Sequence, residues 1–109
     1  MIHEMRLNDL PFQKIRSGLK TAEYRLFDDK RKLVKVGDTM IFSNRLNKSA
    51  KITVQVTKIT SFNSFSDMAK IYPDAKGTEQ YYSVREEKQL GVVAIEFKII
   101  NERIQHHKV

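Results

Sequence analysis

Hydrophobic and polar residues alternate with a period of two in five stretches of the chain, which predicts strands with one buried face. Apolar residues with helical spacing occur in three other stretches. The strand patterns span residues 2–7, 20–27, 39–44, 51–62 and 92–100, and the helical patterns span residues 8–18, 64–72 and 78–91.

Two of the strand patterns predict more than an extended conformation. In 51–62, Ile59 is out of phase with the apolar residues before it, so we expect a bulge near Thr57 or Lys58 that bends the strand. In 92–100, apolar residues occupy both faces almost throughout. We therefore expect this last strand to lie inside the sheet, with a neighbour on each side.

The three helical patterns have ends that the sequence marks. Ser64, followed by Asp67 three residues later, can cap the free amide groups of the second helix, while Gly18 and Gly91 can end the first and the third. The apolar residues that we expect to turn toward the core are Phe12, Ile15, Leu19, Phe65, Met68, Ala69, Tyr72, Tyr81 and Val84.

Five strands interrupted by three short helices predict an α+β fold, with a small curved sheet or partly open barrel whose ends the helices close. Residues 28–38 form a charged connection in this scheme and residues 45–50 a polar loop. A length of 109 residues favours one domain, which we assign to residues 1–104. We expect residues 105–109 to be a flexible tail.

The positive charge of the chain is concentrated in its first part. The net charge is +7, and residues 1–60 hold 13 Lys and Arg against 6 Asp and Glu, whereas residues 61–109 hold 7 of each. One basic surface region would attract phosphate groups, and this favours RNA or a nucleotide as the partner. The alternative is that the charge serves solubility alone.

Several kinds of site are excluded or disfavoured. The absence of cysteine excludes disulfides, thiolate metal sites and a cysteine nucleophile. The chain has no glycine-rich phosphate loop, and the neighbouring His106 and His107 would point apart, so we expect no cofactor and no metal. The N-terminal residues contain no apolar leader and no long apolar run follows, which predicts a cytoplasmic protein without membrane contact.

The candidate chemistry lies in residues 18–38, where basic and acidic side chains are interleaved. Strand alternation places Thr21, Glu23 and Arg25 on one face, close to Lys20. Arg25 could clamp a phosphate or a base edge, Glu23 could accept a proton from an amino group or act as a general base, and Lys20 could stabilise an anion. The alternative is ordinary ion pairing on a solvated sheet face.

Other residues could complete a binding surface around this strand. We expect Arg45 to contact phosphate and Tyr82 to stack on a base, with Tyr24 and Phe27 as weaker aromatic candidates. A peripheral basic group would attract the nucleic-acid backbone, unless it is simply a solvated loop. That group consists of Lys30, Arg31, Lys32 and Lys35.

The same region resembles the ASCH domain, a branch of the PUA-like superfamily that includes small bacterial and archaeal proteins. The resemblance rests on Ser17-Gly18, on the Lys-Thr-x-Glu-x-Arg pattern from Lys20 to Arg25, and on Val36-Gly37-Asp38 before a strand. It implies a mixed β-barrel of five to six strands with about three short flanking helices, and a cleft lined by the Lys-Thr-x-Glu-x-Arg strand.

The resemblance also implies a function. The superfamily is associated with RNA binding and with modified bases, and one group of ASCH proteins hydrolyses N4-acetylcytidine. Its catalytic lysine matches Lys20, but its nucleophilic threonine falls on Glu23, and Thr21 matches only the first threonine of the motif. We therefore expect recognition of a nucleoside or of single-stranded RNA, with an amidohydrolase that uses Lys20 and Glu23 as the alternative. The later catalytic glutamate would correspond to Asp74, Glu79 or Glu86.

Overall fold

The computed structural model describes residues 1–103, and side chains as far as residue 101. The predicted tail at residues 105–109 lies outside the described residues. The strands are β1 (Ile2–Leu7), β2 (Ala22–Leu26), β3 (Thr39–Asn44), β4 (Lys51–Phe62) and β5 (Val92–Arg103). The helices are α1 (Asp9–Arg16), α2 (Asp29–Lys32), α3 (Phe65–Ile71) and α4 (Val84–Leu90), with two 3-10 turns, η1 (Pro73–Ala75) and η2 (Thr78–Tyr81).

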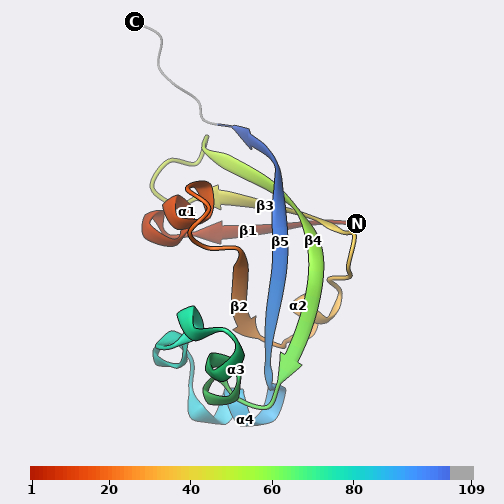
Figure 1. Cartoon of the computed structure of the whole chain (residues 1–109), viewed down its shortest axis with the longest axis vertical. Coiled ribbons are helices and arrows are strands. Elements are labelled where there is room, and N and C mark those ends of the chain that lie inside the picture. The colour runs from red at the N-terminus through yellow and green to blue at the C-terminus, as the bar shows by residue number, and fades with distance from the viewer. Residues whose placement is uncertain (104–109) are drawn as a thin grey trace, which may run out of the picture.

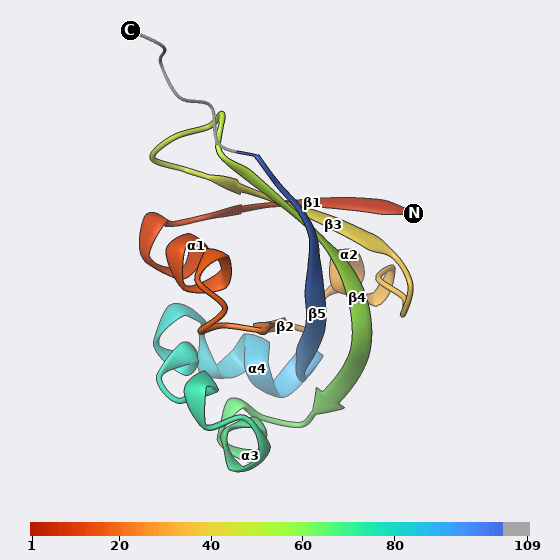
Figure 2. The same cartoon turned by 45° about the horizontal axis from the view of Figure 1, so that its top comes forward.

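The five strands form one mixed sheet in the order β1-β3-β4-β5-β2. β1 runs parallel to β3, and the other pairs are antiparallel. The long strands β4 and β5 form the middle of the sheet, which curls so that its edges β1 and β2 approach the same side of the molecule, where α1 lies (Figures 1 and 2). The predicted α+β class is confirmed, and the curled sheet is half of a barrel.

Two hydrophobic cores hold the helices on the sheet. The first lies inside the curl, where Phe12 and Ile15 of α1 are fully buried against side chains of β3, β4 and β5. The second lies on the other face of β2 and β5, where Tyr24 and Val92 pack against Phe65 and Met68 of α3. Strand β2 is therefore covered on both faces although it is an edge strand.

The predicted bulge in β4 is confirmed. The pairing of β4 with β5 shifts register between Val56 and Lys58, so that Thr57 is the extra residue, and Ile59 packs against the first core. A second shift, between Thr53 and Val54, was not foreseen. Such bulges bend a strand and help a sheet to curl. The expected inner position of β5 is also confirmed, because it pairs with β4 and β2.

Several expectations about the helices were wrong. Residues 78–91 form a 3-10 turn and then a separate helix, because Ser83 and Glu86 make a capping box that starts α4 at Val84. Tyr81 and Val84 are consequently exposed, by 74% and 80%, and Leu19 is 79% exposed because it follows the end of α1. Helix α2 was missed, since it is one short turn capped by the Asp28 side chain.

Candidate functional site

A cleft of about 770 Å³ opens beside the start of β2, between α1 and the segment that carries η1 and η2. Five of the six residues predicted to bind a ligand line this cleft: Lys20, Glu23, Arg25, Arg45 and Tyr82. The sixth, Thr21, is exposed and is absent from the cleft wall. The structure thus brings together residues from β2, the β3–β4 loop and the η2–α4 connection.

Glu23 lies at the inner end of this cleft. The strand register places it opposite Ile95 and Arg25 opposite Val93, so both side chains point toward the first core. Glu23 is buried, with 6% of its surface exposed. Its Oε1 lies 3.6 Å from Arg25 Nε and 4.0 Å from Lys20 Nζ, while Oε2 is buried without a hydrogen-bond partner among the described residues. The negative charge of Glu23 is therefore balanced by cations beside one oxygen only.

A second carboxylate of the cleft, that of Asp74, has a partner. The Tyr24 hydroxyl donates to Asp74 Oδ1 at 2.5 Å. Burial, reinforced by this hydrogen bond and the charge of Asp74, raises the pKa of Tyr24 far above its usual range. Lys20 Nζ also lies 4.5 Å from the centre of the Tyr24 ring. This ring, which belongs to the second core, thus links the cleft to that core.

Asp74 is the one of the three later acidic candidates that lines the cleft. Glu79 instead accepts the backbone N–H of Gly77, and Glu86 takes part in the capping box of α4. Both carboxylates serve local backbone structure, which the sequence pattern could have indicated for Glu86 through the serine three residues before it.

Three exposed apolar or aromatic side chains line the cleft, beside exposed polar ones such as Lys14 and Lys76. Leu10, Leu19 and Tyr81 line it and are 66%, 79% and 74% exposed. Tyr82, the predicted stacking residue, is half-buried, and its ring stacks on Phe65 with centroids 5.4 Å apart and planes inclined by 16°. The exposed aromatic ring at the mouth is therefore Tyr81, which sequence reasoning had assigned to the core.

A second groove, of about 500 Å³, adjoins the cleft. Arg6, Arg25 and Arg45 line both cavities. The predicted peripheral basic group divides here, because Lys30 and Arg31 line the groove whereas Lys32 and Lys35 do not. Lys32 Nζ lies 5.7 Å from the centre of the Phe27 ring, which is partly buried and outside the cleft.

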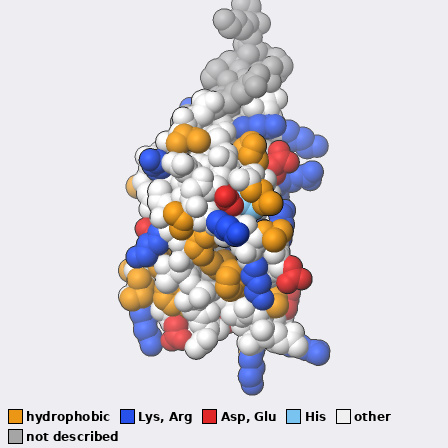
Figure 3. Space-filling model, turned by 90° about the vertical axis from the view of Figure 1, so that its right-hand side faces the viewer, with side chains coloured by type: hydrophobic (Ala, Val, Ile, Leu, Met, Phe, Trp, Pro, Cys, Tyr) orange, Lys and Arg blue, Asp and Glu red, His pale blue; other side chains and the backbone are white. Residues whose placement is uncertain are grey.

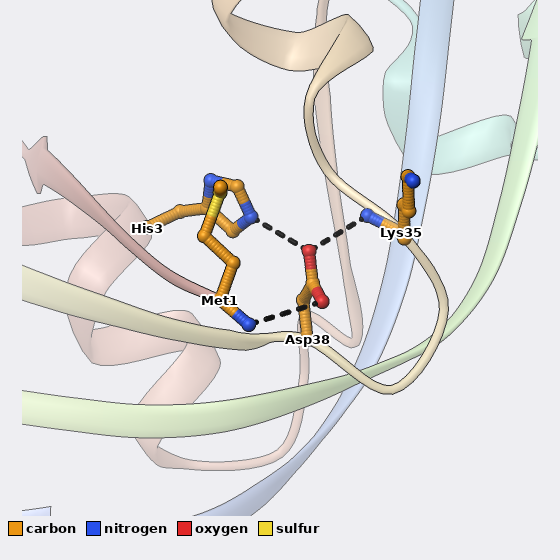
Figure 4. Close-up of polar contacts among 4 residues, drawn as sticks. All are labelled: Met1, His3, Lys35 and Asp38. Atoms are coloured by element: carbon orange, nitrogen blue, oxygen red, sulfur yellow. Dashed lines mark hydrogen bonds and ion pairs between the residues drawn. The ribbon is translucent and has the colours of Figure 1, made fainter.

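A contrasting polar cluster surrounds Asp38 near the start of β3 (Figure 4). Its carboxylate accepts hydrogen bonds from His3 Nε2 at 2.8 Å, the Lys35 backbone N–H at 3.0 Å and the Met1 amino group at 3.4 Å. Because an ionised carboxylate only accepts, the proton of the His3 ring must lie on Nε2. The hydrogen bond from His3, with that from Lys35, lowers the pKa of Asp38 to about 2.

The side of the molecule turned away from α1 carries charged and hydrophobic side chains together. Figure 3 shows this side, on which Lys and Arg side chains alternate with acidic and hydrophobic ones. Within residues 1–103, no three His, Asp or Glu side chains gather as metal ligands would, and His106 and His107 lie outside that range. None of the described helices is both long and apolar enough to span a bilayer.

Known proteins with similar sequences and structures share the fold of this chain. The family model of the ASCH domain matches residues 3–101. The crystal structure of the hypothetical protein PH0355 is similar, with 34% identity and a TM-score of 0.76, over 92% of this chain and all of that one. The solution structure of PF0455 from Pyrococcus furiosus shares 30% identity, with a TM-score of 0.66, over 92% of this chain and 98% of that one.

A more distant likeness concerns the fold alone. A variant of an ASCH protein from Zymomonas mobilis has 13% identity and a TM-score of 0.66, over 93% of this chain and 70% of that one. A search of curated proteins found no match.

Proposed function

Because this chain belongs to the ASCH domain family, we propose that its cleft binds a nucleobase, as a free nucleoside or within single-stranded RNA. The observation that carries this proposal is the buried Oε2 of Glu23, which has no hydrogen-bond partner among the described residues. Leaving a buried polar group unpaired costs about 1–3 kcal/mol, and more for a charged one. A ligand that supplies the missing donor would remove this cost.

The chemistry of Glu23 restricts what the ligand presents. An ionised carboxylate accepts hydrogen bonds and cannot donate them, so its partner must be an N–H or O–H group. The exocyclic amino groups of cytosine, adenine and guanine are such donors. Entry of a base requires Lys20 and Arg25 to rotate, and both are long side chains that remain 15% and 22% exposed. Lys20 can then donate to a base carbonyl.

The exposed apolar side chains of the cleft suit the faces of the same ligand. A base that reaches Glu23 with its edge would pass Leu10, Leu19 and Tyr81, whose exposed surfaces line the entrance. Stacking of a base on an aromatic ring contributes about 1–3 kcal/mol in single-stranded nucleic-acid sites. We assign this role to Tyr81, because one face of the Tyr82 ring is already covered by Phe65.

The test is a comparison of short homopolymeric RNAs at constant salt, with fluorescence anisotropy as the readout. Oligocytidylate and oligoadenylate should bind at least about five times more tightly than oligouridylate, because uracil has no exocyclic amino group and its ring N–H lies between two carbonyl oxygens that would repel the carboxylate. The free nucleosides should show the same order. Equal affinity for all oligonucleotides and nucleosides would overturn the proposal, as would binding of none.

One observation favours a second candidate, hydrolysis of an acylated nucleoside such as N4-acetylcytidine. Lys20 and Glu23 lie together in the cleft, with Nζ and Oε1 4.0 Å apart. A hydroxyl nucleophile would have to come from Thr78, which carries the one aliphatic hydroxyl among the described residues that line the cleft. That hydroxyl already donates to the Ala75 carbonyl at 2.7 Å. Glu23 would instead deprotonate a water, which attacks the acetyl carbonyl. Glu23 then returns that proton to N4 as the C–N bond breaks, which gives acetate and cytidine.

This second candidate is tested by incubating the protein with N4-acetylcytidine and separating the products by chromatography. Hydrolysis requires that cytidine accumulates over many turnovers and that Glu23→Gln abolishes the reaction. If N4-acetylcytidine binds without turnover, the cleft is a binding site alone.

A further inference from the structure

The groove beside the cleft is strongly basic. Among the described residues that line it, six are cations and Glu4 is the one acidic residue. The cations come from β1, β2, α2, the β3–β4 loop and the start of β4: Arg6, Arg25, Lys30, Arg31, Arg45 and Lys51. No single stretch of sequence contains this cluster, since its members are spread over 46 residues of the chain from Arg6 to Lys51.

Most of this charge is not neutralised by the protein. Within the part of the chain that the structure describes, four of the six cations form no ion pair with a carboxylate: Arg6, Lys30, Arg45 and Lys51. Six cations around one groove repel one another, and such an arrangement is stabilised when an anion enters. The groove therefore has the electrostatic character of an anion-binding site.

Arg31 supports this interpretation independently. Its side chain is only 13% exposed, and its Nη1 donates to Asp28 Oδ2 at 3.2 Å. Asp28 also caps α2 through the backbone N–H of Arg31. One aspartate thus holds both the helix and the guanidinium, so that Arg31 is fixed in the groove wall at little further entropic cost. The buried Nε of Arg31 has no hydrogen-bond partner among the described residues.

The groove and the cleft are continuous. Arg25 lines both, and its Nε also lies 3.6 Å from Glu23 Oε1, at the inner end of the cleft. Arg45 likewise lines both cavities, and its Nη1 donates to Asn8 Oδ1 at 3.4 Å. A ligand that spans the two cavities would therefore present an N–H group in the cleft and negative charge in the groove.

We propose that the groove binds backbone phosphates of a single-stranded RNA whose base occupies the cleft, an inference that rests on the proposed function of the cleft. In this arrangement the base donates a hydrogen bond to Glu23. Arg25 and Arg45 contact the phosphate next to that base, and phosphates further along the strand contact Lys30, Arg31 and Lys51. The preferred ligand is then an oligonucleotide rather than a free nucleoside, and its affinity falls with salt.

The experiment measures the affinity of fluorescently labelled oligocytidylate between about 50 and 200 mM salt. The variant is Lys30→Ala with Lys51→Ala, since both side chains are exposed and their loss leaves the cores intact. The matched control is Lys88→Ala with Lys98→Ala, which removes the same charge from exposed positions outside the groove. Melting temperatures of all three proteins establish that they are folded.

The groove variant should lose two phosphate contacts, so the slope of log K against log salt should decrease in magnitude by about 1.4. Its affinity for oligocytidylate should fall about tenfold near 100 mM salt, with affinity for free cytidine unchanged. The control should keep the wild-type slope. If the groove variant and the control behave alike, the groove proposal is overturned.

The two proposals fail differently. An unchanged slope in the groove variant, with tighter binding of amino-bearing bases than of uracil, would refute the groove and leave the cleft standing. A reduced slope without any base preference would refute the cleft as a base site, and the groove would then bind phosphates without base recognition. If inorganic phosphate binds as tightly as the oligonucleotide does, the oligonucleotide is refuted as the occupant of the groove.

Discussion

Two largely buried carboxylates of this protein have very different surroundings. Asp38, 15% exposed in its side chain, has donors on both oxygens, from a ring, a backbone amide and an amino group. Glu23, 8% exposed, has two cations at 3.6 and 4.0 Å from one oxygen and, among the described residues, no hydrogen-bond partner on the other. The first arrangement stabilises the fold, and the second leaves an acceptor that a ligand can use.

The difference has a local origin. Asp38 follows Gly37, whose φ of 93° closes a turn that brings the Lys35 backbone N–H to the carboxylate. Pairing of β1 with β3 then delivers His3. Glu23 lies in a regular strand paired with β5, so no turn directs a backbone donor toward its side chain. Only long side chains can reach it.

The largest expected effect comes from Glu23→Gln. If the unpaired oxygen accepts a hydrogen bond from an amino group, the preference for oligocytidylate over oligouridylate, expected to be at least about fivefold, should disappear. The melting temperature should stay the same or rise, because a buried and incompletely paired charge is removed. If the Glu23→Gln protein keeps the preference for oligocytidylate and its melting temperature clearly falls, Glu23 stabilises the fold as Asp38 does, which contradicts the contrast between the two carboxylates.

Asp38→Asn should have the opposite profile. The substitution weakens the acceptor of three hydrogen bonds, so the melting temperature should fall by roughly 5 °C while the base preference remains. Circular dichroism melts, together with the same RNA titrations, provide the measurement. Loss of the base preference in a folded Asp38→Asn protein would show that the two carboxylates are coupled.

The pH dependence of stability tests whether the charge of Asp38 stabilises the fold. The pKa of Asp38 is lowered to about 2 from its ordinary 3.8, so the stabilisation that it provides is complete above the unfolded value and is lost as pH falls through about 2. The difference in melting temperature between wild type and Asp38→Asn should therefore shrink as the pH falls from about 4 to about 2. A constant difference over this range would exclude a role for the charge of Asp38.

The smallest effect is expected from Tyr24→Phe, which concerns a third carboxylate. Asp74 lines the cleft but already accepts from the Tyr24 hydroxyl. Removing this hydroxyl should cost about 1 kcal/mol of stability, measured by urea denaturation, and should change RNA affinity no more than about threefold. A larger change in affinity would mean that Asp74 takes part in ligand binding beside Glu23.

Local patterns of hydrophobic and polar residues predicted much of the fold. The strand alternation identified all five strands, and the phase change at Ile59 located the bulge in β4. The helical segments were less well predicted, because a capping box at Ser83 ended one expected helix and started another. Propensity along the chain does not decide between one long helix and two short ones when such a cap is present.

Strand alternation alone places Glu23 and Arg25 on one face, because side-chain direction in a strand has a period of two that depends on no distant contact. The tertiary structure was needed to reveal that Glu23 Oε2 has no hydrogen-bond partner among the described residues, that Thr21 lies outside the cleft, and that Tyr81 lines it. It also decided which cations meet in one groove. These facts depend on the curl of the sheet, which brings together segments far apart in the chain.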